Sequence, residues 1–101
     1  MLEHALAYTP EAEAQLLDLY WYLAAEASPE TAARFTEAIV ERCETLRRFP
    51  ERGAPRFDVR PGLRILTFRR VTIAYAVVET QVIVLGIFHG GQDHESILGE
   101  E

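Results

Sequence analysis

The hydrophobic period of the chain changes once, and that change limits the possible folds more than any other feature. Up to residue 49 the apolar residues recur at intervals of three and four, the spacing of an amphipathic helix. From residue 63 they form short runs rich in Val, Ile, Leu and aromatic residues, as β-strands do. The segment 50–62 between them holds three of the five prolines and two glycines, which is typical of a loop. Helices followed by strands predict an α+β fold.

Two similar signals predict where the helices begin. In Thr9-Pro10-Glu11 a capping hydroxyl precedes a proline, which has no N–H to leave unpaired, and an acidic residue suited to the helix dipole. Ser28-Pro29-Glu30 repeats the pattern. We therefore predict one helix over about 10–26 and a second that ends before Pro50. The short connection folds the two helices into a hairpin.

The second half predicts three antiparallel strands in a meander, over Leu63–Phe68, Val71–Val78 and Val82–His89. His4–Tyr8 predicts one further strand before the first helix. The predicted order is β-α-α-β-β-β, in a single domain over residues 1–101. The expected architecture is an antiparallel sheet with the two-helix hairpin packed on one face.

The last predicted strand is apolar on both faces. Strict alternation places its residues in two sets, Val82, Val84, Gly86 and Phe88 on one face and Ile83, Leu85 and Ile87 on the other. A two-helix layer covers only one face of a sheet, so something else must cover the second. Two covers are possible, namely a partner chain or the C-terminal tail with Ile97 and Leu98.

The charges are unevenly distributed. Sixteen acidic and ten basic residues give a net charge of −6, and all ten basic residues are arginines, nine of them within residues 42–70. An arginine-rich middle in an acidic protein indicates a surface for an anion or an acidic segment, although arginines that only solvate a helix end and a loop would look the same. The candidates for binding an acidic partner are Arg56, Arg60, Arg69 and Arg70.

Two other side chains have a structural and a functional interpretation. Trp21 lies outside the apolar stripe of the first helix and forms with Leu17 either an exposed aromatic anchor or a cover over the neighbouring helix. Cys43 lies in the apolar stripe of the second helix and is expected to be a small core residue, not a nucleophile.

Metal, cofactor and membrane functions have no support in the sequence. His89, Asp93, His94 and Glu95 lack a recognised ligand spacing, so neither a metal nor a cofactor is expected. There is no apolar run long enough to span a bilayer and no signal-peptide profile. With a single cysteine, the chain is expected to be cytoplasmic.

Four segments together resemble the ParE branch of the RelE/ParE toxin superfamily, whose members are often described as plasmid-stabilisation proteins. The resemblance runs from Tyr8 to Asp93, and its most specific parts are Leu46–Gly53, Pro61–Arg64, Ile73–Tyr75 and Ile87–Asp93. It implies the toxin component of a type II toxin–antitoxin system, held in a hetero-oligomeric complex by an antitoxin whose C-terminal segment wraps the toxin. Such segments are usually acidic, which would suit the arginine-rich middle.

The resemblance leaves two targets, because ParE-like toxins are associated with poisoning DNA gyrase and RelE-like toxins cleave messenger RNA on the ribosome. RNA cleavage needs a base, a cation and an acid, which lysines, arginines and a C-terminal tyrosine supply in RelE-like enzymes. This chain has no lysine and no tyrosine after Tyr75, which leaves Arg64 and His89 as the catalytic candidates. Arg64 could equally pair with a helix carboxylate, and His89 could cap the strand end.

Net acidity also disfavours a target covered in RNA. The sequence therefore favours a gyrase poison that acts by binding and is not an enzyme. The alternatives are a ribosome-dependent endoribonuclease and an inactive or repurposed binding module of the same fold. The residues proposed to contact the antitoxin or the target are Trp21, Arg56, Arg60, Arg64, Arg69, Arg70 and His89.

Overall fold

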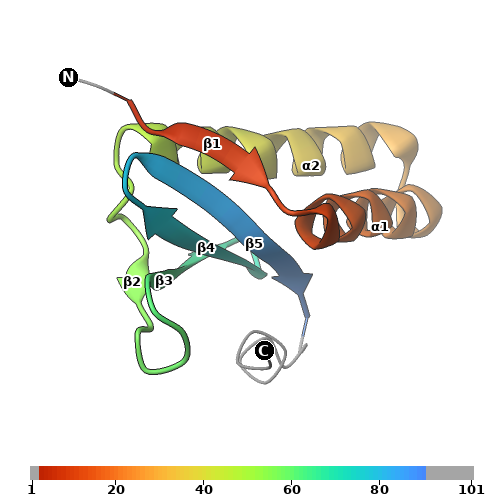
Figure 1. Cartoon of the computed structure of the whole chain (residues 1–101). Coiled ribbons are helices and arrows are strands. Elements are labelled where there is room, and N and C mark those ends of the chain that lie inside the picture. Colours follow the sequence, from red (N-terminus) through yellow and green to blue (C-terminus); the bar gives the residue numbers. More distant parts are fainter. Residues whose placement is uncertain (1–2, 91–101) are drawn as a thin grey trace.

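The fold has two layers, a helical hairpin and a five-stranded sheet (Figure 1). The structure is a computed structural model and describes residues 3–90. The predictions made for Asp93, His94, Glu95, Ile97 and Leu98 lie outside that range. The two helices are α1 (Pro10–Glu26) and α2 (Pro29–Glu44), and a short 3₁₀ turn, η1 (Thr45–Arg47), continues α2.

Both predicted helix starts are confirmed, and each is capped by a hydroxyl. The Thr9 Oγ1 accepts a hydrogen bond from the Ala12 N–H at 3.1 Å, and the Ser28 Oγ accepts one from the Thr31 N–H at 3.0 Å. Such a cap satisfies one of the backbone donors that a helix start leaves unpaired, and it stabilises a helix by about 1 kcal/mol. The second helix ends before Pro50, as predicted.

The meander is confirmed, and its strands are β3 (Leu63–Phe68), β4 (Val71–Val78) and β5 (Gln81–His89). The sheet is mixed, however, because β1 (Ala5–Tyr8) pairs with β5 in parallel. Both strands run towards the start of α1, and the Thr9 N–H donates to the Val84 carbonyl at 3.0 Å. A two-residue strand, β2 (Ala54–Pro55), completes the order β1-β5-β4-β3-β2. Local patterns did not predict it, because it is so short and contains a proline.

A β-bulge at Leu85 overturns the predicted alternation along β5. Ala74 of β4 pairs with Gly86 and Tyr75 with Val84, so Leu85 is the additional residue. From the bulge onward the faces are exchanged. On the helix side Ile87 packs in the same cluster as Val84, whereas Phe88 packs on the other side with Leu85. The strict assignment of Phe88 and Ile87 to faces was therefore wrong.

Two side chains from the first helical segment satisfy the backbone around this bulge. The Thr9 hydroxyl donates to the Leu85 carbonyl at 3.2 Å, and the Gln15 Oε1 accepts from the Ile87 N–H at 2.7 Å. A bulge interrupts the ladder and leaves backbone groups without strand partners. These two bonds replace such partners and fasten α1 to β5.

The second face of the sheet is partly covered by the described chain itself. Leu63, Ala74 and Phe88 are buried there, and Val59 of the segment after β2 packs against them. A partner chain over the rest of this face stays a prediction. The tail offered as the alternative cover lies outside the described residues.

The main core lies between the hairpin and the sheet and includes Cys43, which is fully buried beside Ile39 and Leu19. Its predicted core position is confirmed. Burial raises the pKa of the Cys43 thiol to about 11, and burial likewise raises the pKa of Tyr8 beside it. The neutral thiol is the wrong form for nucleophilic attack. Within residues 3–90 no helix has the length and apolar character to cross a membrane.

Candidate partner-binding surface

The loop between η1 and β2 is fixed to the sheet by one buried hydroxyl. Tyr75 of β4 donates its O–H to the Pro50 carbonyl at 2.8 Å and accepts the Gly53 N–H at 2.8 Å. Its side chain is fully buried, and this burial is the main reason that its pKa is raised. The loop carries Arg52, so Tyr75 positions one cation of the arginine-rich region.

Arg64 supports the same loop from β3. Its guanidinium donates to the Gly53 carbonyl at 2.9 Å and to the Glu51 carbonyl at 3.3 Å. It also lies 5.6 Å from the centre of the Phe57 ring. The ion pair with a helix carboxylate, given above as the structural alternative for Arg64, does not occur among residues 3–90. Arg64 therefore acts as a clamp on backbone carbonyls.

The structure does not bring the two ribonuclease candidates together. Arg64 lies in the row of paired residues that contains Tyr75 and Val84, whereas His89 lies in the row that contains Val71. The rows are about four residues apart along the strands, and β4 lies between the strands of the two residues, so their backbones are roughly 16 Å apart. Arg64 also points to the loop, so the pair does not form one active site.

His89 instead approaches α1. Its ring lies 5.5 Å from the ring of Tyr22, with the planes tilted by 31°. Trp21 is 62% exposed, which favours the anchor interpretation over a cover on the neighbouring helix. The Trp21 ring lies 5.2 Å from the ring of Tyr20, measured between centroids, with the two planes at 84°.

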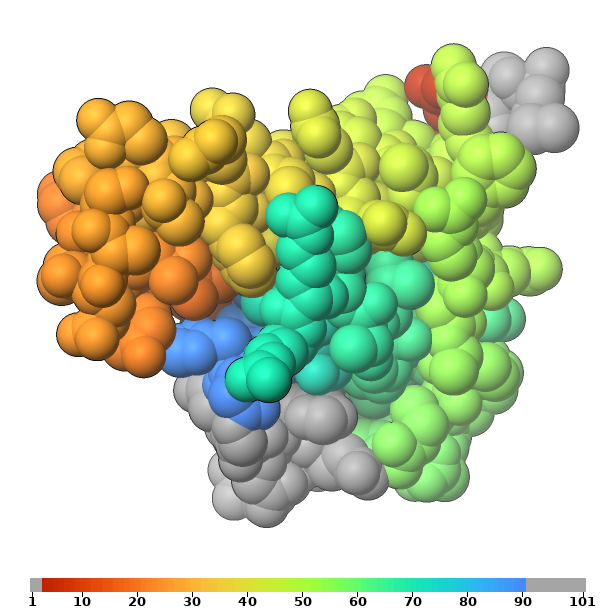
Figure 2. All heavy atoms as spheres, turned by 180° about the vertical axis from the view of Figure 1, so that it is seen from behind, coloured from red at the N-terminus to blue at the C-terminus, as the bar shows by residue number. Residues whose placement is uncertain are grey.

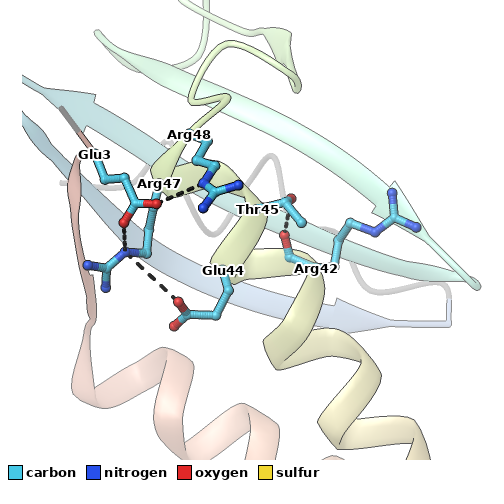
Figure 3. Close-up of polar contacts among 6 residues, drawn as sticks. All are labelled: Glu3, Arg42, Glu44, Thr45, Arg47 and Arg48. Carbon is cyan, nitrogen blue, oxygen red and sulfur yellow. Dashed lines mark hydrogen bonds and ion pairs between the residues drawn. The ribbon is translucent and has the colours of Figure 1, made fainter. Parts of the chain in front are cut away.

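Several arginines are already neutralised. The carboxylate of Glu3 accepts the Arg48 Nε–H at 2.8 Å and lies 3.7 Å from the Arg47 Nε, as Figure 3 shows. The hydrogen bond from Arg48 is the main reason that the pKa of Glu3 is lowered. In the segment after β2, Arg56 pairs with Asp58 at 3.2 Å. These side chains offer less net charge to a partner than the sequence suggests.

Three other arginines gather at a hollow over Phe68, at the end of the sheet. The guanidinium of Arg42 lies 4.6 Å from the centre of the Phe68 ring, and that of Arg69 lies 5.0 Å from it. Both line the hollow of about 420 Å³ together with Arg52 and with one carboxylate, that of Glu41. Figure 3 shows Arg42 pointing away from Glu3, and Figure 2 shows the β3–β4 turn (teal) lying against α2 (yellow).

No carboxylate within residues 3–90 lies within 4.0 Å of the nitrogens of these three arginines. We call Arg42, Arg52 and Arg69 around Phe68 the arginine hollow. Charges of one sign without local partners produce a potential that attracts an anion, and guanidinium groups bind carboxylates and phosphates with two parallel hydrogen bonds. Arg69 was among the candidates from the sequence, whereas Arg42, Arg52 and Phe68 were not, because a helix residue, a loop residue and a strand residue come together here only in the folded chain.

The turn that carries Arg69 is strained. Arg69 and Arg70 connect β3 to β4, and both have positive φ angles, 51° and 66°. A two-residue hairpin turn with both φ angles positive normally holds Asn-Gly, because other residues are disfavoured there. Such strain is characteristic of functional sites. Two arginines therefore occupy a turn whose backbone favours Asn-Gly, at a cost in backbone energy.

Replacing Arg69-Arg70 by Asn-Gly is therefore expected to raise the free energy of unfolding by about 1 kcal/mol, since the new residues suit the turn. Urea denaturation followed by circular dichroism measures the change. The control is Asn-Gly in place of Glu79-Thr80 at the β4–β5 turn, where only Glu79 has a positive φ, 56°. A smaller gain is expected there. A loss of stability at the arginine turn would show that its backbone carries no strain.

Among residues 3–90 there is no group of three His, Cys, Asp or Glu side chains that could hold a metal ion. What the described surface offers is a set of guanidinium groups, a clamped loop and exposed apolar side chains on α1. These features suit the binding of another macromolecule.

Comparison with known proteins gives a family match and matches to solved structures. Residues 6–94 match a family described as the ParE toxin of the type II toxin-antitoxin system, parDE. A chain of the chromosomal ParDE TA system from P. aeruginosa has the same fold, with a TM-score of 0.76 and 27% sequence identity. The match covers 86% of this chain and 96% of that chain. Among curated proteins, none matches.

Proposed function

Because this chain belongs to the ParE toxin family of type II toxin–antitoxin systems, we propose that a cognate antitoxin neutralises it and that the free toxin poisons DNA gyrase by binding. The antitoxin is expected to place an acidic segment on the arginine hollow. The observation that carries this proposal is the set of three guanidinium groups without a carboxylate partner in the described chain.

Action by binding, and not by catalysis, is supported by the separation of the two catalytic candidates. RNA cleavage needs an acid, a base and a cation within reach of one phosphate. Arg64 holds the loop carbonyls, and His89 stacks on Tyr22, two strands away. Trapping the enzyme–DNA intermediate requires only a surface complementary to it and no catalytic group.

The antitoxin part is tested with two pairs of charge variants that remove the same charge. The double variant Arg42→Gln, Arg69→Gln removes two of the three arginines of the arginine hollow, whereas Arg47→Gln, Arg48→Gln removes two arginines already paired with Glu3. The antitoxin is to be sought as the product of a short acidic reading frame adjoining this one, and its affinity is measured by titration calorimetry at two salt concentrations. We expect the first pair to raise Kd by about tenfold, or about 1.4 kcal/mol, and to weaken the salt dependence. Equal effects of the two pairs would contradict the proposal.

The gyrase part is tested by adding purified toxin to a gyrase supercoiling assay and, in parallel, to an in vitro translation mixture analysed by primer extension. We expect cleaved DNA to accumulate with gyrase, and antitoxin to prevent it. Codon-specific messenger cleavage that His89→Ala abolishes would favour the ribonuclease alternative instead. Arg64→Ala is less suitable for this test, because it also releases the loop that Arg64 clamps.

A further inference from the structure

Two exposed phenylalanine rings each have a guanidinium group beside them. Phe49 and Phe57 are 54% and 56% exposed, and both lie in the segment between η1 and β3, which runs along the β2 edge of the sheet (lime and green in Figure 1). The Arg52 guanidinium lies 5.3 Å from the centre of the Phe49 ring, and the Arg64 guanidinium lies 5.6 Å from that of Phe57. The first pair borders a hollow of about 440 Å³ lined by residues 48–52. Each pair presents a flat ring together with a positive charge.

Backbone hydrogen bonds hold both rings in place. Phe49 and Arg52 are the first and last residues of a turn, in which the Arg52 N–H donates to the Phe49 carbonyl at 3.1 Å. Phe57 lies in the next turn, in which the Val59 N–H donates to the Arg56 carbonyl at 3.0 Å, and Val59 itself packs against the sheet. Aromatic side chains on such fixed turns lose little freedom when they bind a ligand.

Arg64 joins the two pairs into one surface. Its guanidinium donates to the carbonyls of Glu51 and Gly53, which are the residues on either side of Arg52. The same guanidinium lies beside the Phe57 ring. The two ring–guanidinium pairs are therefore neighbours in space. We call this set the Phe–Arg surface, and its members are Phe49, Arg52, Phe57 and Arg64.

The charge around this surface is opposite to that of the chain as a whole. Residues 47–64 contain six arginines and two carboxylates, a net charge of +4, in a chain of net charge −6. One of the two carboxylates, Asp58, pairs with Arg56. Neither Arg52 nor Arg64 has a carboxylate within 4.0 Å in the part of the chain that the structure describes. The Phe–Arg surface therefore attracts an anionic ligand.

We infer that the Phe–Arg surface binds a short unpaired stretch of nucleic-acid strand, whose bases stack on the two rings and whose phosphates meet the guanidinium groups. Every base has a flat π face, and unpaired bases stack on aromatic rings and guanidinium planes. Paired bases keep these faces inside the duplex, so a double strand is bound much more weakly. An acidic peptide would satisfy the guanidinium groups but would leave both rings exposed.

The source of the strand is the DNA on which gyrase acts, and in this respect the inference rests on the proposed function. A direct contact with the strand lets the toxin hold the enzyme–DNA intermediate by both of its components. RNA has similar bases and the same phosphates, so it is the other source that this chemistry allows. The two sources are separated by comparing probes of equal length.

Binding is measured with the whole toxin by fluorescence anisotropy. The probe is a labelled oligothymidylate of about 12 nucleotides, within the usual site size of single-strand binding proteins. Oligouridylate of the same length and a DNA duplex of the same length are the comparison probes. We expect saturable binding of the DNA strand, no tighter binding of the RNA strand, and a Kd at least about tenfold higher for the duplex. With about two phosphates neutralised, log Kd is expected to rise with log salt at a slope of about 1.4.

Matched variants locate the binding. Phe49→Leu and Phe57→Leu keep an apolar side chain and remove the ring, and each is expected to raise Kd by about tenfold. Tyr22→Leu removes a ring that is 52% exposed on α1 and is expected to leave Kd unchanged. Arg52→Gln is expected to lower the salt slope by about 0.7, whereas Arg34→Gln, which removes the same charge from α2, should not change it.

Four results would overturn the inference. They are no binding of the DNA strand, a duplex bound as tightly as the single strand, an RNA strand bound more tightly than DNA, and equal losses for Tyr22→Leu and the two phenylalanine variants. These measurements need neither gyrase nor antitoxin. A toxin that binds the strand but yields no cleaved DNA with gyrase would contradict the proposed function alone. A toxin that poisons gyrase equally well with both phenylalanines replaced would contradict the inference alone.

Discussion

Replacing Gly53 by alanine is expected to lower the free energy of unfolding by about 1–3 kcal/mol, because the added methyl group has no space. A Cβ at this position would lie 2.7 Å from the Tyr75 hydroxyl oxygen and 2.9 Å from the Ile65 carbonyl oxygen. The carbonyl belongs to β3, opposite Ala54 in the ladder, and cannot move alone. The hydroxyl cannot retreat without losing its bonds to Gly53 and Pro50.

Tyr75→Phe removes the hydroxyl oxygen that a Cβ at Gly53 would meet and leaves the Ile65 carbonyl oxygen in place. By itself it is expected to cost about 1–3 kcal/mol, because the Gly53 N–H and the Pro50 carbonyl lose their partner in a buried position. Gly53→Ala should then cost less in the Tyr75→Phe protein than in the wild type, since one of its obstacles is gone. A double-mutant cycle measured by urea denaturation gives this coupling.

Gly90→Ala is the control for this cycle. Nothing lies within 4 Å of a Cβ at Gly90, so its alanine meets only the cost of a positive φ of 69°, about 1 kcal/mol. If Gly53→Ala were as stable as the wild type, the loop would not be closed on Tyr75. Arg52 belongs to this loop, so Gly53→Ala is also expected to weaken antitoxin binding.

Local signals were sufficient for the helices and the meander. Thr9 and Ser28 predicted the two helix starts correctly, because the capping hydrogen bond joins residues only three positions apart. The boundaries of β3 and β4 agree with the sequence prediction, since the breaks at residues 69–70 and 79–80 are turns between apolar runs. In each case the residues that determine the feature are neighbours in the chain.

Features that depend on distant contacts were not predictable in this way. The parallel pairing of β1 with β5 joins residues about 75 positions apart, such as Ala5 with Gln81, and no pattern in either strand encodes it. The bulge at Leu85 is of the same kind, because Thr9 and Gln15 stabilise it from another element. One additional residue exchanges the two faces of a strand, so the error spread to every residue after it.

The site was predictable only in outline. The concentration of arginines in residues 42–70 is visible in the sequence, but whether an arginine is available depends on where the carboxylates lie. Glu3 forms an ion pair with Arg48, which lies 45 positions away in the chain. Arg42, only six positions before Arg48, instead places its guanidinium over the ring of Phe68. An ion pair with a helix carboxylate was one of two interpretations of Arg64, and the structure shows hydrogen bonds to loop carbonyls instead. The sequence shows which segment carries the arginines, and the fold determines which of these arginines have no carboxylate close by.

The bulge itself leads to the second large effect, at Gly86. A Cβ there would lie 2.6 Å from the Phe88 Cζ and closer still to its Cε2, because the ring of Phe88 lies over Gly86 on the face away from the helices. Phe88 is only 3% exposed, and its cluster with Leu63 and Ala74 limits its movement. Gly86→Ala is therefore expected to cost about 1–3 kcal/mol, as overpacking does.

The double variant with Phe88→Leu tests this cause. Leucine removes the ring atoms that the new methyl group meets, so Gly86→Ala should cost markedly less in the Phe88→Leu protein, with a coupling of about 1 kcal/mol or more. Under strict alternation Ile87 would point away from the helices, and the bulge is what places it on the helix side with Val84. Absence of coupling between Gly86 and Phe88 would mean that the ring does not cover the glycine. In that case the bulge would not account for the burial of Ile87 and Phe88 on opposite faces of β5.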